Sequence, residues 1–142
     1  MHFPRSRPRL LLLIVSTAAL LTALLAAPLL GRADSFVLLA TYDGVINPVS
    51  AEYLHDALAS AEESGAQALI VRLNTPGGLD TSMRLIIKDI TGSNIPVVVY
   101  VSPSSGRAAS AGVFITMAAH VAAMAPGTNI GAAHPVAMGG GE

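Results

Sequence analysis

The sequence predicts an α/β fold built on a parallel β-sheet. Aliphatic segments of strand length alternate with segments whose apolar residues recur at helical spacing, in the order strand, helix, strand, helix, strand, helix, strand. This alternation is typical of a parallel sheet whose strands are joined by crossover helices and buried on both faces. The length of 142 residues fits one such domain.

The first 33 residues form a separate segment with the pattern of an export signal. Arg5, Arg7 and Arg9 precede Leu10–Leu30, a run of 21 residues without a charge. A basic start, an apolar run and small residues after it predict a signal peptide that is cleaved after Ala33. The run is also long enough to cross about 30 Å of hydrocarbon as a helix, so an uncleaved membrane anchor is the alternative. Because arginines stay on the cytoplasmic side, both alternatives place the remaining chain on the extracytoplasmic side.

Residues 35–65 predict the first strand and the first helix. "SFVLLATYDGVI" is a buried strand that breaks at Asp43-Gly44. Ser50 is the predicted N-cap of a helix in "AEYLHDALASAEESG", and Gly65 ends that helix. Its apolar face comprises Leu54, Ala57, Leu58 and Ala61.

Residues 66–102 repeat the pattern. "AQALIVRLN" and "IPVVVYVS" are short aliphatic strands on either side of a helix in "LDTSMRLIIKDITGS". Asp80 or Thr81 is predicted to cap this helix, and Gly92 to end it. Its apolar face comprises Met83, Ile86, Ile87 and Ile90.

The last part of the chain adds one helix and one strand. "AASAGVFITMAAHV" predicts the helix, with His120 near its C-terminal end as a partner of the helix dipole. "VAAMAPG" predicts the fourth strand. The closing "HPVAMGGGE" contains no helix that would complete the sheet. We therefore expect a sheet truncated at its C-terminal side and a chain that is a fragment of a longer one.

Composition excludes several kinds of site. After Ala33, four basic residues stand against nine acidic ones, a net charge of −5 without a basic patch, so nucleic acid is not an expected partner. The chain has no cysteine, which excludes disulfides, thiolate metal sites and a cysteine nucleophile. The four histidines lack metal-ligand spacing, and neither a metal nor a cofactor is expected.

The segment "NTPGG", from Asn74 to Gly78, directly follows the second predicted strand. Ligands of open parallel sheets bind outside the carboxyl ends of the strands. Paired glycines adopt φ angles that turn their amides toward a shared point, which suits an oxyanion. The alternative is an ordinary tight turn between a strand and a helix.

The segment "GRAASAG" follows the third predicted strand and places Ser110 at the start of a helix. Amides are unpaired there and the helix dipole favours developing negative charge, so Ser110 is a candidate nucleophile. The alternative is a seam of small residues in which Ser110 is an N-cap. Both segments lie at the same edge of the predicted sheet, where the amides of Gly78 and Ala111 would hold one carbonyl oxygen. Together they indicate acyl transfer.

Three motifs in order, "LNTPGGLDTSMRLI", "GRAASAGVFITMAA" and "APGTNIGAAHPV", resemble the membrane-bound serine proteases of the NfeD family, also called stomatin operon partner proteins. The resemblance runs from Phe36 to the end of the chain. Their protease domain is similar to the Clp protease subunit and to signal peptide peptidase A. The resemblance implies a ClpP/crotonase-like fold of stacked ββα units, with residues 34–142 as the N-terminal part of the protease domain.

The resemblance also implies roles for individual residues. Ser110 is the implied nucleophile, Gly78 and Ala111 supply the oxyanion amides, and Gly77 and Leu79 line the substrate strand. It implies a polypeptide substrate, a stomatin- or prohibitin-like membrane partner, assembly into a homo-oligomer and a place at the cell membrane. Full-length members are similar in carrying membrane-spanning helices and a small β-barrel after the protease domain.

The residue that acts as the general base is not assigned by these motifs. The resemblance implies a lysine beyond Glu142, which would leave these 142 residues inactive by themselves. Lys88 is the only lysine present and is expected to be a solvated charge. His134 is the alternative base. The other interpretation of His134 is a purely structural role in a turn. A crotonase-fold enzyme acting on acyl-CoA thioesters and a non-catalytic membrane scaffold of the same fold are the alternative functions.

Overall fold

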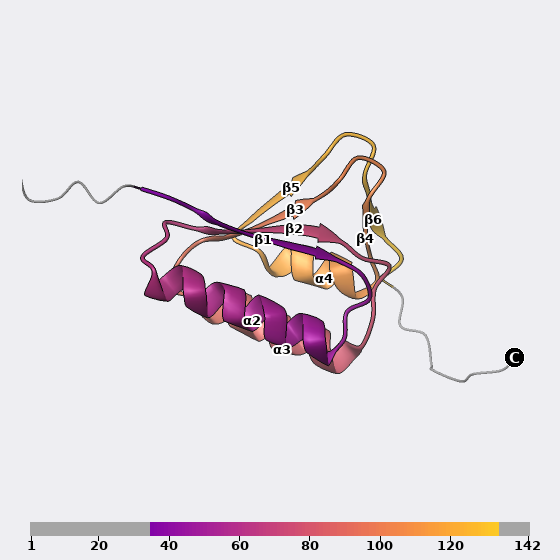
Figure 1. The fold of residues 1–142 in the computed structure, drawn as a ribbon. Coiled ribbons are helices and arrows are strands. Elements are labelled where there is room, and N and C mark those ends of the chain that lie inside the picture. The colour runs from indigo at the N-terminus through magenta and orange to yellow at the C-terminus, as the bar shows by residue number, and fades with distance from the viewer. Residues whose placement is uncertain (1–34, 134–142) are drawn as a thin grey trace, which may run out of the picture. The chain divides into compact units, whose positions relative to one another are not determined.

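The computed structural model describes residues 35–133 of the chain. They form an α/β fold around a fully parallel four-stranded sheet with the strand order β1-β2-β3-β5 (Figure 1). These strands are β1 (Leu38–Asp43), β2 (Leu69–Asn74), β3 (Val97–Val101) and β5 (Val121–Met124). A second, two-stranded parallel sheet pairs β4 (Arg107–Ala109) with β6 (Asn129–Gly131). The α/β fold, the parallel sheet and the four aliphatic strands are confirmed.

Three helices cover one face of the larger sheet: α2 (Pro48–Glu63), α3 (Asp80–Gly92) and α4 (Ala111–Ala118) (Figure 1). The middle helix, α3, packs against both others. No helix within residues 35–133 combines the length and the apolar character needed to cross a bilayer. The predicted signal or anchor over residues 1–33 lies outside the described residues.

The sheet is buried on one face. Ala40, Val71 and Val99 align across β1, β2 and β3, and all three are buried in the core beneath the helices. The alternate row places Leu39, 55% exposed, beside the half-buried Ile70 and Val98. The prediction of burial on both faces is wrong for the described residues, because their helices all pack on the same side.

The start of α2 is capped by Asn47 rather than by Ser50. Ser50 N donates to Asn47 Oδ1 at 3.0 Å, and Asn47 N donates to Ser50 Oγ at 2.9 Å. This reciprocal pair is a capping box, with Ser50 at the third helical position. Pro48 fits the first turn because the amide it lacks has no partner inside a helix. The prediction for Ser50 was three positions too late.

The start of α3 has no side-chain cap. Its N-cap is Leu79, and Asp80 accepts a hydrogen bond from Arg84 Nε at 2.7 Å instead, so neither predicted cap, Asp80 or Thr81, caps it. The hydrogen bond to Asp80 and then the charge of its carboxylate raise the pKa of Arg84. Both side chains are mostly exposed, so this ion pair contributes little to stability.

The segment before α4 is a strand where a helix was predicted. Thr75 N donates to Arg107 O at 2.7 Å and Ala109 N donates to Thr75 O at 3.0 Å, which holds residues 107–109 extended as β4. His120 lies beyond the C-cap of α4, Ala119. Its Nδ1 accepts from Val97 N at 3.1 Å, so it completes the start of β3 rather than the end of the helix.

Candidate active site

The structure brings the Gly77–Gly78 turn and Ser110 together. A Cβ built on Gly77 would lie 2.6 Å from Ser110 Cβ and 3.1 Å from Ser110 Oγ. Gly77 has φ 112°, a conformation that favours glycine. Gly77 and Ser110, 33 positions apart in sequence, therefore meet without another side chain between them, at the edge of the sheet where β2 ends. The predicted juxtaposition of these segments is confirmed.

Ser110 adopts an uncommon backbone conformation between β4 and α4. Its φ of 51° and ψ of −115° lie outside the regions that residues with a side chain normally occupy. Such conformations cost about 1–3 kcal/mol and concentrate at functional sites. A strand, a strained serine and a helix follow one another here, as they do in the sharp turn on which α/β-hydrolases carry their nucleophile. The half-buried Ser110 makes no side-chain bond to the helix amides, so it does not act as the hydrogen-bonding N-cap considered above.

Two amides beside this serine have no acceptor within residues 35–133. Ala111 is the first residue of α4, so its N–H has no partner inside the helix. Ile46 N donates to Gly77 O at 2.9 Å and Leu79 N donates to Ile46 O at 2.9 Å. These two bonds make a parallel β-bridge between Ile46 and Gly78. In such a bridge the N–H and C=O of Gly78 point away from Ile46, and the Gly78 amide donates to no described residue. Ser110 N, in contrast, donates to Gly131 O at 2.9 Å.

Gly78 is required for a different reason from Gly77. A Cβ at Gly78 would collide with the main chain of Ile46, lying 2.6 Å from its nitrogen. Gly78 itself is exposed. Leu79 is 38% exposed next to it. Gly77 O and Leu79 N are already hydrogen-bonded to Ile46. The main-chain groups of Gly78 are the ones in this extended stretch that remain available for another strand.

Thr75 is a site residue that the sequence analysis missed. It is fully buried, and its Oγ1 accepts from Gly77 N at 3.1 Å. A Cβ on Gly112 would lie 2.5 Å from Thr75 Cγ2, so the methyl group supports the first turn of α4. The sequence does show a threonine at the end of a strand, directly before Pro76. It does not show the contact of this threonine with α4, because Gly112 is distant in sequence.

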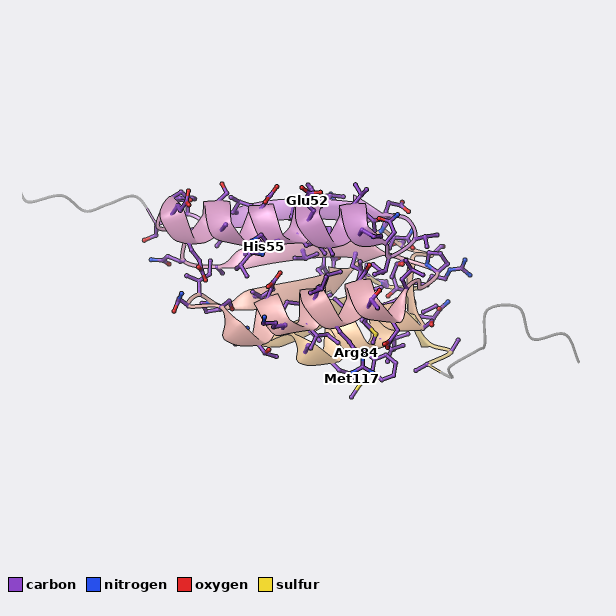
Figure 2. All side chains as sticks on the ribbon, turned by 90° about the horizontal axis from the view of Figure 1, so that it is seen from below. Glu52, His55, Arg84 and Met117 are labelled. Carbon is purple, nitrogen blue, oxygen red and sulfur yellow. The ribbon has the colours of Figure 1, made fainter. Side chains whose placement is uncertain are left out.

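The candidate bases are not placed at the serine. His134 lies outside the described residues. Lys88 is exposed on α3, as predicted for a solvated charge. His55, on α2 at its border with α3, pairs with Asp89, its Nδ1 3.0 Å from Asp89 Oδ2 (Figure 2). Within residues 35–133, no hydrogen bond joins a titratable side chain to Ser110 Oγ, and no group of three His, Asp or Glu side chains is arranged to hold a metal ion.

This geometry provides two of the parts that acyl transfer needs, a hydroxyl and amides that are free to donate. The hydroxyl stands on a strained turn, and the amides of Gly78 and Ala111 have no acceptor within residues 35–133. Backbone amides held in place beside a nucleophile stabilise the oxygen of a tetrahedral intermediate.

Comparisons with known proteins agree in sequence and in structure. The family model described as NfeD1b, N-terminal domain, matches residues 40–142. Membrane-bound protease PH1510 of Pyrococcus horikoshii is 40% identical over 112 residues, which are 79% of this chain and 25% of that protein. Membrane protein NfeD1b of Bacillus subtilis is 42% identical over 83 residues, 58% of this chain and 18% of that protein.

Solved structures of a 1510-N membrane-bound stomatin-specific protease share the fold. One, with a serine changed to alanine, has a TM-score of 0.72 at 38% identity over 77% of this chain and 54% of that chain. Another, with a lysine changed to alanine and a substrate peptide bound, has a TM-score of 0.72 at 40% identity over 73% of this chain and 48% of that chain.

The chain spans a quarter or less of the two curated relatives and about half of these solved chains. The family match nevertheless covers most of the chain, including both segments of the candidate site. The chain belongs to the NfeD family, through its NfeD1b N-terminal domain.

Proposed function

We propose that residues 34–142 are the N-terminal part of a ClpP/crotonase-like protease domain in a membrane-associated serine endopeptidase, with Ser110 as its nucleophile. The observation that carries the proposal is the backbone of Ser110, strained at φ 51° and ψ −115° directly beside Gly77. A relative named as a membrane-bound protease supports it.

The proposed reaction begins when Ser110 Oγ attacks the carbonyl carbon of a peptide bond. A carbon–oxygen bond forms, the hydroxyl proton passes to the base, and the carbonyl oxygen becomes an oxyanion between the amides of Gly78 and Ala111. The intermediate collapses, the amine leaves with the proton, and an acyl-enzyme on Ser110 remains. Water then attacks the ester, releases the carboxylic acid and restores the serine.

The substrate is proposed to bind as an extended strand along the edge of Gly78. Gly78 N–H and C=O face away from Ile46, whereas Gly77 O and Leu79 N are bonded to it. A peptide strand that pairs on this edge brings its carbonyl to the Gly78 amide and lies over Gly77 and Leu79. This is pairing of a peptide with an exposed strand edge.

The base is proposed to be a lysine C-terminal to the described residues, with His134 as the alternative. The solved relative in which a lysine is changed to alanine, with a substrate peptide bound, supports this choice. A lysine accepts a proton only when it is neutral, which burial among apolar side chains favours.

The location and partners complete the proposal. Residues 1–33 act as a signal or anchor, and the protease domain lies on the extracytoplasmic side of the membrane. The named specificity of the solved relatives for a stomatin supports a membrane protein of that kind as substrate or partner. Assembly into a homo-oligomer is part of the same proposal.

Replacing Ser110 by Ala in the full-length protein tests the function. Peptide cleavage should be abolished, and labelling by a fluorophosphonate should be lost with it. Ser105→Ala is the matched control, because Ser105 is another serine with positive φ, at 70°, on an exposed turn. Full cleavage by the Ser110→Ala protein would leave the family fold standing and remove Ser110 as the nucleophile. The absence of cleavage by the wild-type protein would favour the scaffold instead.

A further inference from the structure

Thr75 joins the two halves of the candidate site. It directly follows β2 and is fully buried. Its N–H donates to Arg107 O at 2.7 Å and its C=O accepts from Ala109 N at 3.0 Å, so its main chain holds the strand that leads to Ser110. Its side chain extends this link, because the hydroxyl and the methyl group contact different segments.

The hydroxyl of Thr75 acts on the turn that carries the proposed oxyanion donor. Gly77 N donates to Thr75 Oγ1 at 3.1 Å, and the hydroxyl lies 3.3 Å from Gly77 O, to which it donates. The peptide unit from Gly77 C=O to Gly78 N–H is planar, so holding the oxygen also sets the direction of the Gly78 N–H. Ile46 N holds the same oxygen at 2.9 Å from the other side.

The methyl group of Thr75 acts on the helix. A Cβ on Gly112 would lie 2.5 Å from Thr75 Cγ2, so the first turn of α4 rests directly on this methyl group. Ala111, the other proposed donor, precedes Gly112 in the same turn. One buried side chain thus contacts the structures that carry both amides.

We propose that Thr75 is a positioning residue whose hydroxyl aims the Gly78 amide at the oxyanion, while its methyl group packs under the first turn of α4 and serves stability. This inference rests on the proposed function. The Gly78 amide already meets the carbonyl of the bound substrate, but its hydrogen bond strengthens as negative charge develops on that oxygen, so its aim matters most in the transition state. Loss of the hydroxyl should therefore lower kcat and leave KM unchanged.

Thr75→Val and Thr75→Ser in the full-length protein separate the two roles. Loss of a whole oxyanion donor lowers kcat by about 100–1000-fold, and a misaimed donor should cost less, so we expect a fall of roughly 10-fold or more for Thr75→Val at an unchanged KM. Thr75→Ser keeps the hydroxyl and loses the methyl group, so its kcat should stay within about threefold of wild type, even where its Tm is lower.

Thr116→Val is the matched control. Thr116 is 3% exposed on α4, and its hydroxyl donates to Gly112 O at 2.7 Å without touching the Gly77–Gly78 turn. The same loss of a buried hydroxyl should leave its kcat unchanged. If Thr75→Val does not fold, Thr75→Ala replaces it, since alanine and serine differ at this position by the hydroxyl alone.

The outcomes separate the inference from the function on which it rests. A wild-type kcat for Thr75→Val, a raised KM at constant kcat, or equal losses for Thr75→Ser and Thr75→Val would each overturn the positioning role. If Ser110→Ala, measured in parallel, is inactive in those cases, the proposed function survives. Full activity of Ser110→Ala would overturn both.

Discussion

Gly77 and Ser110 approach each other so closely that no other residue fits at position 77 without displacing the serine. A Cβ there would lie 2.6 Å from Ser110 Cβ and 3.1 Å from the Ala109 carbonyl oxygen. The Ala109 oxygen belongs to the main chain, which cannot rotate away as a flexible side chain would. The turn and the serine therefore set each other's position.

Gly77→Ala should damage both stability and turnover. The new methyl group meets Ser110, and φ 112° is strained for alanine, so we expect a loss of unfolding free energy of about 1–3 kcal/mol. Cleavage should fall steeply because Ser110 is pushed from its place. Chemical denaturation and steady-state kinetics measure the two effects.

Gly92→Ala is the control for that change. Gly92 ends α3, and a Cβ built on it meets nothing within 4 Å. It should keep full activity and wild-type stability or better. Equal behaviour of the two variants would contradict the close approach of Gly77 to Ser110.

Ser110→Gly should stabilise the protein while it abolishes cleavage. Glycine adopts φ 51° and ψ −115° without strain, so relief of about 1–3 kcal/mol should appear as an increased free energy of unfolding. Ser110→Ala should be nearly neutral, because the serine side chain makes no capping bond that alanine would lose. A loss of about 1 kcal/mol in Ser110→Ala, the size of a lost cap, would instead indicate an N-cap role.

Asn47→Ala should destabilise the domain without changing catalysis. Its side chain accepts from Ser50 N at 3.0 Å in the capping box of α2, and losing such a cap costs about 1 kcal/mol. Asn94→Ala, at an exposed asparagine whose side chain makes only a 3.5 Å contact with Glu62, should change stability much less. Equal stability of the two variants in urea would argue against the observed cap.

The N-terminal segment makes a prediction about location. Expressed in a bacterium, the protein should fractionate with the membrane or the periplasm, because three arginines precede the uncharged run Leu10–Leu30. N-terminal sequencing then distinguishes cleavage after Ala33 from an intact anchor. A soluble cytoplasmic protein with its first residue in place would contradict both.

The parts of the fold that were predictable are those encoded by local pattern. The runs that form β2 and β3 are mostly aliphatic, and the apolar spacing around Leu54 and Ile86 identifies two helices. Caps are less predictable: Asn47 and Ser50 are both good cap residues, and both belong to one capping box. Only the reciprocal hydrogen bonds show which of them begins the helix.

The short strands β4 and β6 were missed because nothing local specifies them. Each has three residues, and β4 is extended because Thr75 and β6 pair with it. The candidate serine and glycines could be identified because each segment directly follows a predicted strand, at the sheet edge where ligands bind. Thr75 escaped, since its importance depends on where the distant Gly112 comes to lie.

The bond from Ser110 N to Gly131 O has a consequence for the timing of biosynthesis. The serine comes off the ribosome before β6 does, and its amide has no such acceptor until that later strand has paired with β4. A nascent chain that has exposed Ser110 but not Gly131 should therefore lack the strained turn. Because a chain arrested before residue 129 also lacks the proposed base, the turn has to be followed by amide hydrogen exchange at Ser110 rather than by activity. Slow exchange at Ser110 in that chain would show that the turn forms without its later strand.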